Sequence, residues 1–120
     1  MAKHNDTGQL GEELAARFLV GMGYVIRDRQ WSHKKLELDI VAENEELVII
    51  VEVKTRSSDK FGNPEEAVNE IKEKRLLDAT EAYIIENEID KDIRIDILSV
   101  ILSDPPEIRH LEGAIIPELE

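Results

Sequence analysis

Residues 36–56 read LELDIVAENEELVIIVEVKTR, and this segment carries the clearest structural signal in the chain. Residues 36–43 alternate apolar and polar side chains, a pattern that predicts a strand with one buried face. Residues 46–54 are rich in β-branched side chains, which predicts a central strand buried on both faces. Asn44-Glu45 separates the two runs as a two-residue turn. The segment therefore predicts a β-hairpin in which position 43 pairs with position 46.

The spacing of charged residues predicts that this hairpin has one polar face. Glu37 and Asp39 are two residues apart in the first strand. Glu52 and Lys54 are two residues apart in the second. Because side chains alternate along a strand, an even-length turn places both pairs on the same face. Asp39 and Glu52 then become diagonal neighbours, about 7 Å apart at the backbone, and two carboxylates at that separation can share a hard divalent cation.

Such a set of groups suits metal-dependent hydrolysis of phosphodiesters. Carboxylates hold Mg²⁺ or Mn²⁺ and leave positions for water and a phosphate oxygen, and Lys54 can orient the water or neutralise charge on the phosphate. The alternative is a solvated strand face, because Glu-x-Lys is common on surface strands. Two observations favour the functional interpretation. Charges that interrupt a run of Val and Ile cost several kcal/mol unless they are paired or metal-bound, and a surface ribbon has no need of Glu37 opposite Glu52.

The remaining segments predict one domain, residues 1–120, of α/β or α+β class, with helices packed on a sheet. Gly62-Asn63-Pro64 gives a strong helix start, with Asn as the cap and Pro at the first helical position. The core is expected over about 7–103. The expected elements are a helix capped at Asp6 or Thr7 and ended by Gly21, a strand over 24–31, a long helix to about Asn87, a strand over 93–102, a short strand near Ile108 and a loose acidic tail over about 112–120.

Composition excludes several classes of protein. The 120 residues contain no cysteine, which rules out disulfides, thiolate zinc sites and cysteine nucleophiles. The longest apolar run, residues 47–51, is far short of the roughly 20 residues that span a bilayer, so we expect a soluble cytoplasmic domain with no membrane partner. The net charge of −12 argues against nucleic acid held by bulk electrostatics. Most of the excess acidity lies in residues 61–120, which leaves a nearly neutral first half.

Several short motifs also occur together in a fixed order. They are Gly8-Gln9-Leu10-Gly11-Glu12, Gly23-Tyr24, Glu37-Leu38-Asp39-Ile40-Val41-Ala42, Val51-Glu52-Val53-Lys54-Thr55-Arg56, Gly62-Asn63-Pro64 and Arg94-Ile95-Asp96. As a set, over roughly residues 7–101, they resemble the YraN-like family of bacterial proteins, which is akin to archaeal Holliday junction resolvases. The resemblance implies a restriction-endonuclease-like fold, an αβββαβ core with a mixed sheet flanked by helices.

The resemblance also implies an activity and a site. Asp39, Glu52 and Lys54 would occupy the D…ExK catalytic positions, and Glu12 on the first helix would be an added acidic ligand or water-positioning group. The implied metal ligands are Asp39, Glu52 and Glu12, the cofactor is Mg²⁺ or Mn²⁺, and the substrate is duplex or branched DNA. The prediction is a metal-dependent DNA endonuclease. A catalytically inactive nucleic-acid- or protein-binding module of the same fold is the alternative, and a homodimer fits either, because nucleases of this fold often cut two strands with two copies.

Four basic residues are candidates for binding substrate. Arg56 and Lys60 follow the catalytic strand, and Lys72 projects from the long helix, whereas Lys74 and Arg75 are expected to face solvent. Arg29 shares a predicted strand face with Arg27 and Trp31, and Lys34 and Lys35 follow in the next turn. This set is either a phosphate-binding patch with an aromatic for stacking, or a partly buried Trp between solvated arginines.

Overall fold

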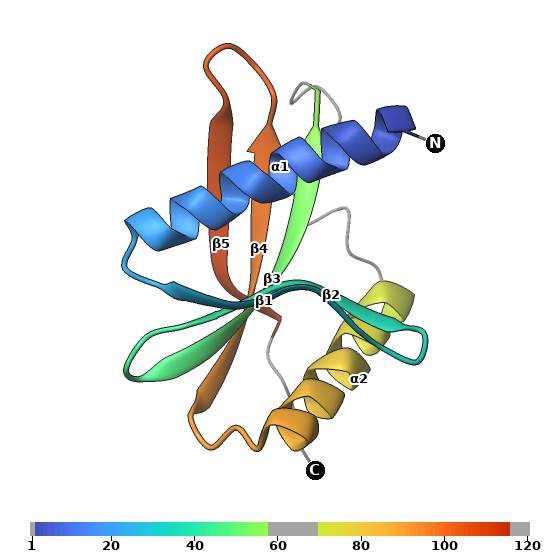
Figure 1. The fold of residues 1–120 in the computed structure, drawn as a ribbon, viewed down its shortest axis with the longest axis vertical. Helices are drawn as coiled ribbons and strands as arrows, with labels where there is room; N and C mark the ends of the chain where they lie inside the picture. Colours follow the sequence, from blue (N-terminus) through green and yellow to red (C-terminus); the bar gives the residue numbers. More distant parts are fainter. Residues whose placement is uncertain (1, 58–69, 116–120) are drawn as a thin grey trace.

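A five-stranded mixed sheet organises the chain, and the computed structural model describes it over residues 2–57 and 70–115, with side chains from Thr7 onward (Figure 1). The sheet order is β1-β2-β3-β4-β5; β3 and β4 are parallel, and every other neighbouring pair is antiparallel. This confirms the predicted α/β class and mixed sheet. The elements are α1 (Ala2–Gly21), β1 (Val25–His33), β2 (Leu36–Glu43), β3 (Leu47–Arg56), α2 (Glu70–Asn87), β4 (Asp92–Ile101) and β5 (Glu107–Ile115).

Each face of the sheet is covered by one helix. α1 packs Ala15, Ala16 and Leu19 against one face, and α2 packs Leu76, Ala79 and Tyr83 against the other. The middle of β3, from Val48 to Val51, contributes alternately to both clusters and is fully buried. This confirms the prediction of a central strand buried on both faces, since consecutive side chains of a strand point in opposite directions.

The β2–β3 hairpin keeps the predicted parity but not the predicted register. Glu43 pairs with Val48 rather than with position 46, and the turn is centred on Glu45-Glu46. The side-chain oxygen of Asn44 accepts hydrogen bonds from the backbone N–H groups of Glu46 and Leu47, at 2.8 and 2.9 Å. Asn44 is therefore the first residue of the turn rather than its second, because its side chain satisfies two backbone donors from that position.

The ends of two elements differ from the predictions. α1 begins at Ala2, before the expected caps Asp6 and Thr7, since residues 2–5 contain no Gly or Pro that would oppose a helix. It ends at Gly21 as predicted, and Gly23, at φ 98°, turns the chain into β1. The expected short strand near Ile108 is the nine-residue β5, which includes residues 112–115 of the expected loose tail.

The pairing of β5 explains why composition misled the prediction of a tail. β5 supplies the antiparallel partner of β4 along its outer edge, from Ile101↔Glu107 to Ile95↔Ile115. The backbone N–H of Gly113 also donates to the fully buried Asp96 carboxylate at 2.9 Å. These are long-range contacts, which local composition does not report.

The other boundaries agree with the predictions to within two residues where they can be compared, and both β1 and β3 extend two residues further than predicted. β4 spans Asp92–Ile101, and α2 ends at Asn87. The expected start of the long helix at Asn63-Pro64 and the last part of the expected tail, residues 116–120, lie outside the described residues. None of the described helices is long and apolar enough to cross a membrane.

Candidate active site where strands β2 and β3 separate

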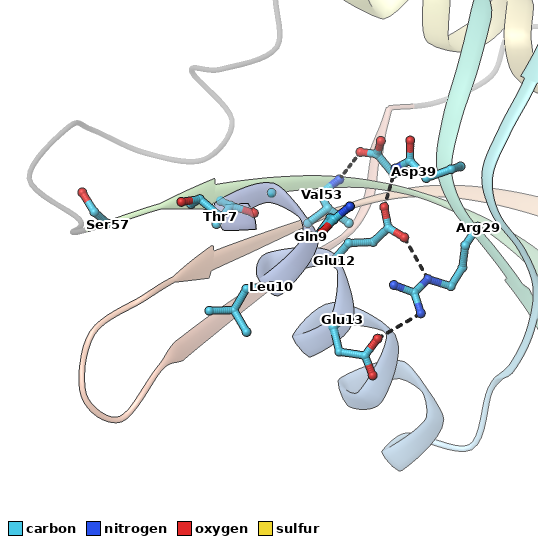
Figure 2. Close-up of a pocket in the computed structure, with 12 residues that line it drawn as sticks. Thr7, Gln9, Leu10, Glu12, Glu13, Arg29, Asp39, Val53 and Ser57 are labelled. Atoms are coloured by element: carbon cyan, nitrogen blue, oxygen red, sulfur yellow. Dashed lines mark hydrogen bonds and ion pairs between the residues drawn. The ribbon is translucent and has the colours of Figure 1, made fainter. Parts of the chain in front are cut away.

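Asp39 lies at the point where the β2–β3 ladder stops. The ladder runs from Glu43↔Val48 to Ile40↔Val51. At the next position the Asp39 carboxylate, not a backbone carbonyl, accepts the hydrogen bond from the backbone N–H of Val53, at 2.9 Å. The side chain of Asp39 is therefore fixed at the opening between the two strands (Figure 2).

Around Asp39, the side chains of β2 stop alternating strictly between the two faces of the sheet. Ile40 packs in the cluster under α1, whereas both Leu38 and Val41 pack in the cluster under α2, so the strict alternation of faces is broken here. On the neighbouring strand, Gln30 has a positive φ of 52°. This irregularity lets Asp39 border cavities on both faces of the sheet.

The cavity on the α2 side gathers most of the predicted catalytic hairpin. It has a volume of about 360 Å³ and includes Glu37, Asp39 and Glu52 among its lining residues. The ammonium of Lys54 is 3.7 Å from a carboxylate oxygen of Glu52. Asp39 and Glu52 are not paired in the ladder, which stops at Ile40↔Val51, but the Glu52 carboxylate is near enough to raise the pKa of Asp39.

The electrostatics of this cluster make Asp39 harder to ionise than an ordinary carboxyl group in the absence of a cation. Burial raises the pKa of Asp39 to about 7, and the adjacent Glu52 carboxylate adds to the rise, while the Val53 N–H opposes it. Burial lowers the pKa of Lys54, and the neighbouring Lys72 ammonium lowers it further, against the opposite effect of Glu52. Strong perturbation by burial together with specific charged neighbours is typical of functional sites.

Glu12 approaches Asp39 from the opposite face of the sheet. It is only 8% exposed, and its carboxylate accepts hydrogen bonds from Arg29 Nε, at 2.8 Å, and from Gln30 Nε2. Arg29 also donates to Glu13, at 3.0 Å (Figure 2). Glu12 and Asp39 both line the α1-side cavity, which has a volume of about 1370 Å³.

A close approach of α1 to β3 fixes the position of Glu12. Gly11 packs directly against Thr55, and a Cβ at Gly11 would lie 2.7 Å from Thr55 Cγ2. Only glycine permits this approach without a shift, since real Cβ atoms do not come so near. The Gly11-Glu12 pair thus sets the helix against the strand that carries Glu52 and Lys54.

The predicted catalytic residues therefore fall into two groups. Glu37, Asp39 and Glu52 line the α2-side cavity and Lys54 pairs with Glu52, whereas Glu12 lines the cavity on the α1 side. Asp39 is the residue that borders both.

The predicted substrate-binding residues have different environments. Lys72 lines the α2-side cavity with Asp39 and Glu52. Arg29 is engaged by Glu12 and Glu13. Arg56 lines neither of these cavities, and its buried Nε has no hydrogen-bond partner among the residues described. Lys60 lies outside the described residues.

The predicted shared face of Arg27, Arg29 and Trp31 is wrong. The register of β1 shifts between Ile26 and Asp28, a β-bulge that strict alternation does not anticipate. Arg27 donates to Tyr83 and Glu43, and Trp31 packs edge-on against the Tyr83 ring at 5.1 Å. Arg29 turns instead toward α1.

Gln30 and Arg75 lie near the site and were not among the predicted site residues, whereas Lys35 was part of the predicted phosphate-binding patch. The side chain of Gln30 donates a hydrogen bond to Glu12. The positive φ of Gln30 has no recognisable signal in the sequence. Lys35 and Arg75 line the α2-side cavity. Arg75 had a usable signal, because it is three residues after Lys72 and so shares its helix face.

The donor set suits a hard divalent cation in charge but does not form a complete cage. Asp39 and Glu52 offer carboxylate oxygens, the ligands that Mg²⁺ and Mn²⁺ prefer, and a cation would offset their repulsion. Within residues 7–57 and 70–115, no three acidic or imidazole side chains converge as a metal site. Mg²⁺ commonly takes one or two protein carboxylates and completes its shell with water and substrate phosphate, so two donors are sufficient.

Comparison with known proteins places the chain in a family. Residues 11–100 match the model of the uncharacterised protein family UPF0102. UPF0102 proteins from Phocaeicola vulgatus and Bacteroides thetaiotaomicron are 44% and 45% identical to it over 120 residues, and each alignment covers 99% of both chains. A UPF0102 protein from Flavobacterium psychrophilum is 44% identical over 115 residues, which are 95% of this chain and 97% of that one. These matches confirm the resemblance to the YraN-like family, and the chain belongs to the uncharacterised protein family UPF0102.

Proposed function

We propose that this protein is a metal-dependent nuclease that hydrolyses phosphodiester bonds of DNA, including branched DNA. The observation that carries the proposal is the placement of Asp39 at the end of the β2–β3 ladder, beside Glu52 and with Lys54 at 3.7 Å from Glu52. The order α1-β1-β2-β3-α2-β4 supports the restriction-endonuclease-like fold that the family resemblance implies. The additional strand β5 extends the sheet beyond this core.

Each residue of the hairpin has a distinct role in this proposal. Asp39 and Glu52 hold the cation, which when bound lowers the pKa of a water molecule and stabilises charge on phosphorus. The Val53 N–H fixes one oxygen of Asp39 and so orients the carboxylate. Lys54, with its lowered pKa, is suited to hold or release a proton near the attacking water, or to interact with the phosphate. Glu12 is held on the α1 side by Arg29 and Gln30, so in this proposal it orients water near Asp39 rather than completing the metal ligands.

A cleavage assay tests this proposal. Labelled single-stranded, duplex and four-way-junction DNA are incubated with Mg²⁺ or Mn²⁺ and with wild type, Asp39→Ala or Glu45→Gln. Glu45 is an exposed acid of the hairpin turn, so its variant is the control. We expect wild type and the control to cleave at least one substrate and Asp39→Ala to be inactive. Equal cleavage by Asp39→Ala and wild type would refute the assignment.

Metal binding can be measured without cleavage. Mg²⁺ or Mn²⁺ should raise the melting temperature of wild type, because a ligand that binds only the folded state stabilises it. Glu52→Gln should abolish the rise, and Glu45→Gln should retain it. A rise of the same size in the Glu52 variant would place the cation elsewhere.

A second candidate is a non-catalytic module that binds nucleic acid or protein. One argument for it is that Glu12 is already bound to Arg29 and Gln30, so that Asp39 and Glu52 are the carboxylates left, with Glu37, around the α2-side cavity. The net charge of −12 is a second argument. Such a module would bind DNA with the same affinity in Mg²⁺ and in a chelator, and it would cleave none of the three substrates. Sedimentation with and without DNA tests the expected homodimer.

A further inference from the structure

The α2-side cavity has walls of opposite charge. Its acidic wall is formed by Glu37, Asp39 and Glu52 from β2 and β3. Its basic wall is formed by Lys35, Lys72 and Arg75. A cavity of about 360 Å³ that is lined by both carboxylates and cations is suited to a ligand that carries both a metal-binding and an anionic group.

Two separate elements bring the basic residues together. Lys72 and Arg75 are three residues apart on α2 and therefore lie on one face of the helix. Leu76, which is 6% exposed, packs that side of α2 into the core and sets its distance from the sheet. Lys35 belongs to the turn between β1 and β2, which lies beside the first described turns of α2 (Figure 1).

Lys35 and Arg75 differ from most cations of this protein in having no acidic partner. Among the residues described, neither forms an ion pair, and both are exposed. In the part of the chain that the structure describes, cations that pair with a carboxylate include Arg17, Arg27, Arg29, Lys54, Lys74, Lys91, Arg94 and Arg109. In a chain with 27 acidic and 15 basic residues, two unpaired cations on one cavity indicate a site for an external anion.

The cavity on the other face lacks this property. Arg29 is the one basic residue among its described lining residues, and it is already bound by Glu12 and Glu13. A polyanion that approached Asp39 from that side would meet carboxylates first. The α2 side therefore offers the electrostatically favourable entrance.

We propose that Lys35 and Arg75, together with Lys72, bind backbone phosphates of a single DNA strand, which enters the site from the α2 side. This inference rests on the proposed nuclease function and names the direction from which its substrate is held. Phosphates on both sides of the bond to be cut would contact the basic wall, while the bond itself faces Asp39 and Glu52. Arg75 can form a bidentate contact with a phosphate, whereas Lys35 and Lys72 act as point charges.

The test is DNA binding without chemistry. The affinity of a fluorescent single-stranded oligonucleotide is measured by anisotropy in EDTA, over a series of salt concentrations, for wild type, Lys35→Gln and Arg75→Gln. Lys74→Gln is the matched control, since Lys74 neighbours Arg75, loses the same charge, is exposed and pairs with Asp78 away from the cavity. Melting temperatures confirm that the variants fold.

We expect Lys35→Gln and Arg75→Gln each to weaken binding by about 3- to 10-fold and to reduce the slope of log K against log salt by about 0.7. The control should leave both quantities close to wild type. An equal loss in Lys74→Gln, or no loss in the two cavity variants, would overturn the proposal, as would a wild type that does not bind at low salt.

The binding assay separates this inference from the proposed function. Weaker binding by the cavity variants, together with no cleavage by wild type in Mg²⁺ or Mn²⁺, would support the phosphate site and refute the nuclease. Cleavage by wild type with an unchanged KM for DNA in both cavity variants would support the nuclease and refute the phosphate site.

Discussion

Replacing Asp39 by Asn should make the protein more stable at neutral pH. The folded state raises the pKa of Asp39 from its usual 3.8 to about 7, through burial and the nearby Glu52 carboxylate. Because the folded pKa lies above the unfolded one, ionisation destabilises the fold progressively as the pH rises from about 4 to about 7. A difference of roughly three pKa units corresponds to at most about 4 kcal/mol, reached above pH 7. Asn removes this charge, and its side-chain oxygen can still accept the Val53 N–H.

The assay is urea unfolding of wild type and Asp39→Asn in EDTA, at about pH 4 and about pH 8. The gain in unfolding free energy should be close to zero at the lower pH and about 2–4 kcal/mol at the higher one. Glu45→Gln, which changes an exposed acid in the turn, should shift stability by no more than about 0.5 kcal/mol at either pH. A variant that is less stable than wild type at pH 8, or a gain independent of pH, would contradict the reasoning, because Asp39 would then be a structural hydrogen-bond acceptor only.

Two further predictions concern the framework of the site. Gly11→Ala should lower the free energy of unfolding by about 1–3 kcal/mol and reduce cleavage, since its methyl group meets Thr55. Gly8→Ala, with open space around it, should raise the free energy of unfolding by up to about 1 kcal/mol. Thermal melts of both variants compare them directly. Arg94→Ala should destabilise the fold by about 3–5 kcal/mol, because it removes two hydrogen bonds of 2.9 Å from the fully buried Asp96. Arg94→Lys should lose less, since it keeps the charge, and equal unfolding midpoints for wild type and Arg94→Ala would refute this account.

The sequence predicted the hairpin of the site through parity rather than through correct register. Asp39 and Glu52 share a face for any even turn, so placing the turn at Asn44-Glu45 instead of Glu45-Glu46 did not separate them. Glu37 lines the same cavity although the alternation of β2 is broken between Leu38 and Ile40, which parity does not explain. The fixation of Asp39 by the Val53 N–H could not be predicted in this way. It depends on where two strands part, which is set by packing on both faces rather than by alternation.

Contacts between distant elements were the least predictable part of the site. The hydrogen bonds from Arg29 and Gln30 to Glu12 form only if α1 packs at one particular position along the strands. The bulge in β1 that turns Arg27 away from Arg29 has no local marker in the sequence. Arg75 was expected in solvent, and it is exposed, but the turn at Lys35 makes its surroundings part of a cavity.

The double exposure of Asp39 has a consequence for any molecule that binds this protein. At this residue the sheet does not separate the two cavities, because the Asp39 carboxylate lines both the α1-side and the α2-side cavity. An occupant of either cavity that takes up the negative charge of Asp39 leaves less of it for an occupant of the other. Two ligands that both neutralise Asp39, one from each cavity, would therefore be thermodynamically linked: binding of the first would change the affinity for the second.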